Sequence, residues 1–181
     1  MKILIVSWHT DSDNNSVANK TILETLEKKL EWAEFDYLCK EYPNYIFDIE
    51  KEQKKLMNAD VIVFQYPLFW YAIPSILQKR IEDVFQHWFS HWRTWDKLTG
   101  KKLVLSITAW APESAYEEDW KNIFDKFINP AKYLCELCNM KYAWEIVTYW
   151  VSYQQRKEHS DEIIQNANEH VEKLVNLLAK L

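Results

Sequence analysis

A short apolar run that ends at a proline constrains the fold of this chain more than any other segment. Val61 to Phe64 is unbroken, apolar and largely β-branched, which is typical of a strand buried on both faces. Pro67 ends the run, and Pro74 suits the first turn of a helix whose later apolar residues recur at helical spacing. Leu68 to Tyr71 therefore follows the carboxyl end of a parallel strand, where open α/β sheets bind ligands.

The rest of the chain alternates strands with helices. The expected strands are Ile3–Ser7, Glu34–Leu38, Val61–Phe64, Lys102–Thr108 and Tyr142–Trp150. The expected helices begin near Ser16, Ile49 and Pro74, continue through Trp120 to Leu137, and end with 161–180. In the last helix, we expect Ile164, Ala167, Val171, Leu174 and Leu178 to face the sheet. This pattern predicts one α/β domain over residues 1–181, with a doubly wound five-stranded parallel sheet in the order 2-1-3-4-5 and helices on both faces.

Composition and charge limit the partners. A net charge of -5 without a long basic run argues against a nucleic-acid binder, so we expect small-molecule partners. We also expect a soluble, cytoplasmic protein, because the first strand follows no leader and no apolar stretch approaches the length of a membrane span. Three cysteines, an odd number, favour free thiols over a disulfide framework.

The polar loop after the first strand is suited to an anion. His9 to Asn15 leads into the helix that begins near Ser16, and unpaired N–H groups at such a helix start attract negative charge. A phosphate fits here, with Ser16 as N-cap or ligand and Asn19 bonding from the first turn. The alternative is a capped helix beneath a solvated loop, and Asp11 and Asp13 count against an anion unless they point outward.

Several short motifs resemble one family. They are Tyr42-Pro43, Asp48-Ile49, Glu52-Gln53, Ala59-Asp60, Gln65 to Tyr71 with Pro74, Pro112 to Tyr116, and Cys138-Asn139-Met140. Together they resemble the flavodoxin-like NAD(P)H:quinone oxidoreductases, in the bacterial branch of modulator of drug activity B and the ancillary oxidoreductases of glutathione-gated potassium efflux. The resemblance covers most of the chain and implies a flavodoxin-like fold, FMN or FAD as cofactor, and NAD(P)H as co-substrate.

The resemblance also implies three walls of a flavin pocket. The phosphate wall is His9, Ser16, Val17, Ala18 and Asn19, and the ring wall is Pro67, Leu68, Phe69, Trp70 and Tyr71. The third wall is Thr108, Ala109, Trp110 and Ala111, where the family has glycines whose backbone N–H groups approach the flavin. Trp110 either swings outward to pack on a partner subunit or fills the place of the flavin.

Tyr116 is the candidate catalytic residue. The resemblance aligns it with a tyrosine whose hydroxyl reaches the site of hydride transfer, as a general acid or an orienter. The alternative is an amphipathic residue at a helix start. The implied reaction passes a hydride from NAD(P)H through the flavin to a quinone or similar electrophile in a ping-pong cycle. The competing function is a flavin-free or weakly flavin-binding relative that acts as a binding or regulatory protein.

The aromatic region from Trp88 to Trp95 exceeds what one small core absorbs, and the resemblance implies a homodimer through it. His87 and His91 stand four residues apart, but no acidic or cysteine partner lies near them in sequence, so we expect no metal site. Cys135 and Cys138 fall within a helical pattern among apolar residues, which favours buried packing over a redox motif.

Overall fold

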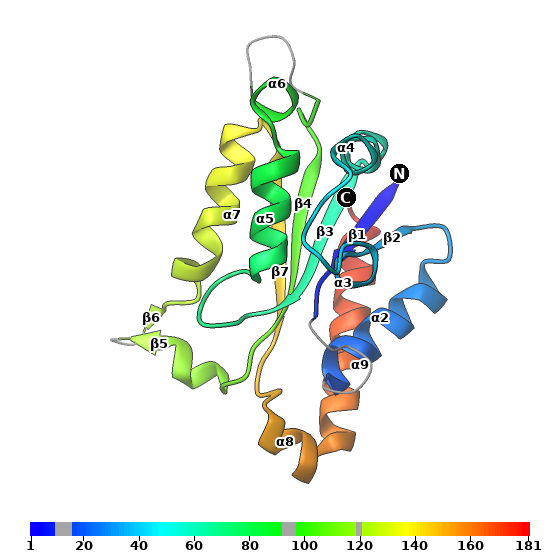
Figure 1. The fold of residues 1–181 in the computed structure, drawn as a ribbon. Helices are drawn as coiled ribbons and strands as arrows, with labels where there is room; N and C mark the ends of the chain where they lie inside the picture. The colour runs from blue at the N-terminus through cyan, green and yellow to red at the C-terminus, as the bar shows by residue number, and fades with distance from the viewer. Residues whose placement is uncertain (10–15, 92–96, 119–120) are drawn as a thin grey trace.

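A five-stranded parallel sheet forms the centre of the molecule (Figure 1). This computed structural model describes residues 1–9, 16–91, 97–118 and 121–181. The sheet order is β2-β1-β3-β4-β7, and each neighbouring pair is parallel, which confirms the predicted order 2-1-3-4-5. The strands are β1 (Ile3–Ser7), β2 (Glu34–Tyr37), β3 (Val61–Pro67), β4 (Lys102–Thr108) and β7 (Lys141–Thr148).

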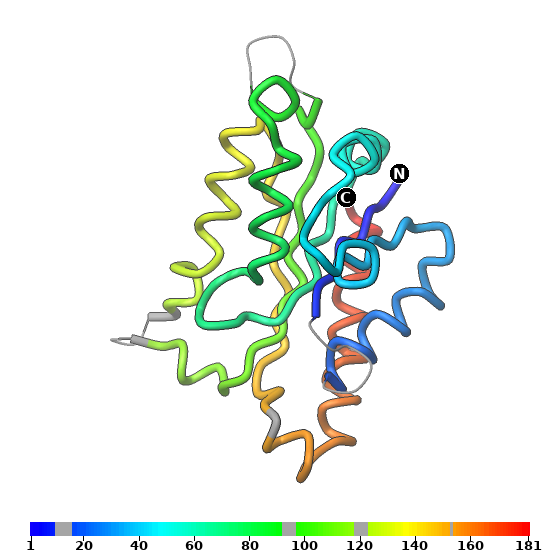
Figure 2. Tube along the Cα trace, viewed as in Figure 1, coloured from blue at the N-terminus to red at the C-terminus, as the bar shows by residue number. Residues whose placement is uncertain are grey.

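Helices cover both faces of the sheet (Figures 1 and 2). The long ones are α2 (Val17–Lys29), α4 (Ile49–Asn58), α5 (Ser75–Val84), α7 (Asp125–Leu137) and α9 (Ser160–Leu178). The short ones are α3 (Leu38–Glu41), α6 (His87–Ser90), η1 (Glu113–Tyr116) and α8 (Tyr153–Glu158). Strand β5 (Glu117–Glu118) pairs antiparallel with β6 (Lys121–Asn122). Helices α2 and α9 lie side by side on one face, and α4, α5 and α7 lie on the other. Within the described residues, no helix combines the length and apolar character that a membrane crossing requires.

Two hydrophobic cores result from the alternation of side chains along the strands. In β1, Ile3 and Ile5 pack toward α2 and α9, whereas Leu4 and Val6 pack toward α4 and α5. Strands buried in this way must be apolar at successive positions, which explains the uninterrupted run that begins at Val61.

The expected bounds are wrong at several strand ends. Strand β3 continues through Pro67, which is tolerated because proline occupies the last residue of the ladder. Strand β2 stops at Tyr37 rather than Leu38, because Leu38 begins the one-turn helix α3. Strand β7 ends at Thr148 rather than Trp150, which has a positive φ of 59°.

One predicted core position in α9 is also wrong. Ile164 is 39% exposed, and Ile163, which is 3% exposed, packs in its place. The buried Ala167 is four residues from Ile163 and three from Ile164. Both spacings are compatible with one helix face, so the pattern alone did not separate the two. The prediction for Cys135 and Cys138 is confirmed, since both thiols are buried.

Helix α4 buries charges that its polar sequence did not reveal. Glu52 and Lys55 are buried beside Asp36 of β2 and Arg80 of α5, whereas Met57 on the same helix is 43% exposed. Arg80 Nε donates to Glu52 Oε2 over 2.7 Å, and Lys55 Nζ donates to Asp36 Oδ1 over 2.8 Å. A polar helix face therefore packs on this side because its charges are paired.

Candidate functional site

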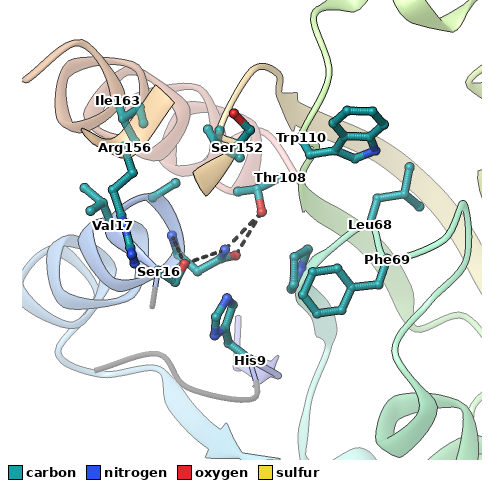
Figure 3. A pocket seen from close by; sticks show the side chains of 14 residues that line it. His9, Ser16, Val17, Leu68, Phe69, Thr108, Trp110, Ser152, Arg156 and Ile163 are labelled. Carbon is teal, nitrogen blue, oxygen red and sulfur yellow. Dashed lines mark hydrogen bonds between the residues drawn. The ribbon is translucent and has the colours of Figure 1, made fainter. Parts of the chain in front are cut away.

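A pocket opens at the carboxyl edge of the sheet, between the start of α2 and the ends of β3 and β4 (Figure 3). The cavity has a volume of about 260 Å³. Its lining is His9, Ser16, Val17, Ala18, Asn19, Pro67, Leu68, Phe69, Thr108, Trp110, Val151, Ser152, Arg156 and Ile163. The structure thus brings together the whole predicted phosphate wall with parts of the other two walls.

The phosphate end of the pocket is built on the N-terminus of α2. Ser16 is the N-cap, as expected, and its Oγ accepts the backbone N–H of Asn19 over 3.2 Å. The Asn19 side chain donates to Ser16 Oγ over 2.9 Å and to Thr108 Oγ1 over 3.0 Å. The N-terminus of α2, with the positive end of its helix dipole, therefore faces the pocket together with a hydroxyl. Residues 10–15 of the predicted loop lie outside the described residues.

A segment that sequence reasoning missed closes the same end. Val151 and Ser152, between β7 and α8, line the pocket together with Arg156 on α8. Ser152 caps α8 by accepting the backbone N–H of Gln155 over 3.2 Å. Figure 3 shows the Arg156 side chain extending alongside Val17 toward Ser16, which adds positive charge to the anion end. The sequence did contain a signal for this segment: another polar junction between a strand and a helix, with an arginine, at the same edge of the sheet.

The aromatic loop forms a tight turn. Trp70 and Tyr71 have positive φ angles of 51° and 61°, and the backbone N–H of Ala72 donates to the Phe69 carbonyl over 2.9 Å. Phe69 lines the pocket and packs edge-on against Trp8, with ring centroids 5.4 Å apart. Trp70 is 93% exposed and Tyr71 53%, and neither lines the cavity. The turn therefore gives Phe69 to the pocket and leaves an indole exposed beside it.

The third wall is formed by Thr108 and Trp110. Trp110 lines the pocket and is 58% exposed, while Ala109 and Ala111 are buried behind the lining. The Ala109 N–H donates to the Thr148 carbonyl over 2.8 Å, so it extends the sheet. Neither Trp110 nor Ala111 has the positive φ that would require glycine. The absent glycines are thus compatible with the backbone here, and the indole forms part of the rim.

Tyr116 is buried in a cluster of aromatic side chains. It is 1% exposed, and its ring lies 5.3 Å from Phe124 and 5.6 Å from Tyr149, measured between centroids. Burial raises the pKa of its hydroxyl, although the backbone N–H of Ala111 opposes that shift. Tyr116 therefore stays protonated at neutral pH. It does not line the cavity, and its catalytic role remains a prediction.

A group of carboxylates elsewhere has the spacing of a metal site. Among the described residues, Asp36, Glu41 and Glu52 bring their oxygens within 4.8 Å of one another. The Lys55 ammonium lies 2.8, 3.1 and 2.7 Å from oxygens of these three residues. A side-chain cation thus occupies the position between the carboxylates, as is usual for buried charges in proteins.

The parallel order, the capped α2 terminus and the aromatic loop at one sheet edge define a protein of the flavodoxin-like class. The family model described as "Flavodoxin-like fold" matches residues 1–175, and the chain belongs to this family.

Curated relatives span nearly the whole chain. The chain is 33% identical over 151 residues to "Uncharacterized NAD(P)H oxidoreductase YrkL" of Bacillus subtilis, covering 82% of this chain and 86% of that protein. It is 30% identical over 180 residues to the glutathione-regulated potassium-efflux system ancillary protein KefG of Escherichia coli, covering 98% and 95%. A solved structure, general stress protein 14 of Treponema denticola in complex with FMN, superposes with a TM-score of 0.83 at 19% identity, covering 97% and 98% of the two chains. That likeness shows the fold.

Proposed function

We propose that this protein is a flavin-dependent NAD(P)H oxidoreductase that passes a hydride from NAD(P)H through FMN or FAD to a quinone or similar electrophile. The observation that carries the proposal is one pocket with an anion end at Ser16 and an aromatic end at Phe69. The relative named NAD(P)H oxidoreductase, at 33% identity, supports the redox activity.

The residues of the pocket fit a flavin mononucleotide unit. Ser16, the start of α2 and Arg156 supply donors and positive charge for a phosphate. Phe69 and Trp110 supply aromatic surface for a conjugated ring at the other end. Anion and ring of one ligand are thereby bound in a fixed orientation.

The chain's own residues orient and anchor the ligand and donate protons. When bound, a flavin supplies the two-electron chemistry, accepting a hydride and giving it up again. The phosphate end holds the ligand. The exposed side chains of Phe69, Trp70 and Trp110 leave the ring end open to the nicotinamide first and to the acceptor afterwards. Because the two substrates use the same site one after the other, the cycle is ping-pong. The protonated Tyr116 hydroxyl is a proton donor for an oxygen of the electron acceptor, once the neighbouring aromatic side chains let that acceptor approach.

Three finer assignments belong to this proposal. The protein acts in the cytoplasm, and it works as a homodimer through the region Trp88 to Trp95. Trp88 on α6 is 68% exposed, which favours an interface there, while 92–95 lie outside the described residues. Tyr71 and the buried Ala109 and Ala111 belong to the proposed flavin site, although they do not line the cavity.

A second function is a binding or regulatory protein that holds flavin weakly or not at all. Trp110 lines the pocket where the resembling family has glycine, and this observation favours the alternative. The name of the 30% identical relative, an ancillary protein of a potassium-efflux system, is consistent with it.

The first experiment is a visible absorption spectrum of the purified protein, alone and after titration with FMN and then FAD. A retained flavin band that bleaches with NADH or NADPH supports the oxidoreductase. Ser16→Ala should raise the Kd for FMN about tenfold by removing one hydrogen bond to a charged group. Ser114→Ala, on the exposed η1 turn, is the control and should leave the Kd unchanged. A wild-type protein that neither retains nor binds flavin would refute this function and favour the alternative.

A further inference from the structure

A continuous series of buried polar side chains runs from the pocket into the core between the sheet and α9. Its members are Asn19 on α2, Gln65 on β3, Ser106 on β4, Thr148 on β7 and His170 on α9. The exposed fraction of Thr148 is 8%, and that of each other member is 3% or less. Because buried polar groups are costly unless they are paired, each donor in this series needs an acceptor.

The inner end of the series, at His170, determines the direction of its hydrogen bonds. Burial lowers the pKa of His170 to about 3, with Lys173 adding to the shift, so the imidazole is neutral and has one N–H. Its Nε2 lies 2.6 Å from Ser106 Oγ, and its Nδ1 lies 2.8 Å from Thr148 Oγ1. Ser106 donates its single hydrogen to Gln65 Oε1. Ser106 therefore accepts from His170 Nε2–H, and Thr148 donates to Nδ1.

The same direction continues to the pocket. Gln65 Nε2 donates to Asn19 Oδ1 over 2.9 Å, which turns the Asn19 amide nitrogen toward Ser16 and Thr108. Ser16 Oγ accepts from both the backbone N–H and the side-chain amide of Asn19. Both lone pairs of the Ser16 oxygen are then used, and no acceptor among the described residues takes its hydrogen, which is available to a ligand.

We propose that His170, Ser106 and Gln65 are positioning residues that fix the direction of this series, so that Ser16 meets the ligand as a hydrogen-bond donor and selects a phosphate group. In the reverse direction, Asn19 Oδ1 would face Ser16 and take up its hydrogen. Phosphate oxygens are acceptors, so only the first direction strengthens phosphate binding. This inference rests on the proposed function, because it assumes that the bound anion is the flavin phosphate.

The test compares FMN with riboflavin, which has the same ring and no phosphate. Ser106→Ala interrupts the series without touching the pocket lining and should raise the Kd for FMN about tenfold while that for riboflavin stays constant. Val104→Ala is the matched control, since Val104 is buried two residues earlier on β4 and faces the same core. It should leave the ratio of the two Kd values unchanged.

A second pair of variants tests the inner end and does not depend on Ser106→Ala folding. Thr148→Ser keeps the hydroxyl that donates to His170 and should preserve the preference for FMN, whereas Thr148→Val removes it and should reduce the preference. In the wild type, the ¹⁵N chemical shifts of His170 should report the Nε2–H tautomer.

The outcomes separate the two proposals. If the wild type binds neither flavin, the proposed function fails. If the wild type prefers FMN, but the variants keep that preference or lose both flavins equally, the positioning role is overturned and the function stands. An Nδ1–H tautomer of His170 would also overturn the positioning role.

Discussion

Asn19 and Thr108 stand 89 residues apart in the chain, and the Asn19 amide nitrogen lies 3.0 Å from the Thr108 hydroxyl oxygen. This contact joins the first turn of α2 to the last residue of β4 at the base of the pocket. Both side chains are buried, so the contact fixes how the start of α2 sits over the sheet. The geometry of the anion end therefore depends on the sheet order as much as on the local sequence.

Because Trp70 has a positive φ, we predict that glycine at this position gives a more stable protein than alanine. At Trp70, with a φ of 51° and 93% exposure, Trp70→Gly should be more stable than Trp70→Ala by about 1 kcal/mol, because only glycine adopts positive φ without a Cβ clash. Urea denaturation measures the difference. The same pair at Phe69, which does not have a positive φ, is the control and should show no glycine advantage. Equal stability of the two Trp70 variants would contradict the turn.

Trp110 lies at the ring end of the pocket, so its removal should affect both flavins alike. Trp110→Ala should raise the Kd for FMN and for riboflavin by a similar factor of roughly 3 to 10, as expected for the loss of one aromatic contact of about 1 kcal/mol. Fluorescence quenching of each flavin during titration measures both constants. Tighter binding by the variant would mean instead that the indole blocks the site.

His170 predicts acid sensitivity. Its pKa is about 3 in the folded protein and 6.5 ordinarily, so between these values the unfolded chain binds a proton that the folded chain excludes. The free energy of unfolding contributed by this group is retained above pH 6.5 and falls by about 1.4 kcal/mol for each pH unit below it.

Asp36 changes the free energy of unfolding in the opposite direction, so its contribution must be removed from the comparison. Burial raises its pKa from 3.8 to about 7, so in that interval the folded protein holds the extra proton and acid is stabilising. The difference in stability between wild type and His170→Gln removes the Asp36 contribution. As the pH is lowered from about 6 to about 4, this difference in the free energy of unfolding should decline, as measured by urea denaturation. A constant difference would contradict the burial of a neutral His170.

Arg80 predicts a large loss of stability. It is fully buried and donates to Glu52, whose pKa is lowered to about 2 because Arg80, Asp36 and Lys55 outweigh the effect of burial. Arg80→Ala should therefore cost about 3 to 5 kcal/mol, because it removes one of the two cations, Arg80 and Lys55, that pair with the buried carboxylates.

The neighbouring Lys79 provides the control on the same helix. Its pair with Asp83 is solvent-accessible, with side-chain exposures of 44% and 28%, so Lys79→Ala should cost less than about 1 kcal/mol. Chemical denaturation of both variants measures the contrast. Similar losses at the two positions would show that the buried cluster carries no special weight.

Sequence by itself determined the strand order and most of the pocket. Unbroken apolar strands separated by helices permit few arrangements other than a parallel sheet, and the carboxyl ends of such strands meet at one edge. Ser16, Phe69 and Thr108 follow that rule, so their meeting could be predicted from local pattern.

Tertiary structure decided the features that depend on distant partners. The burial of Glu52 and Arg80, the entry of Arg156 into the pocket and the series from Asn19 to His170 each join segments far apart in the chain. A buried polar residue has the same local sequence signature as a solvated one, because its partner, and not its neighbours in the chain, makes burial favourable. Only the folded sheet brings those partners within hydrogen-bonding distance.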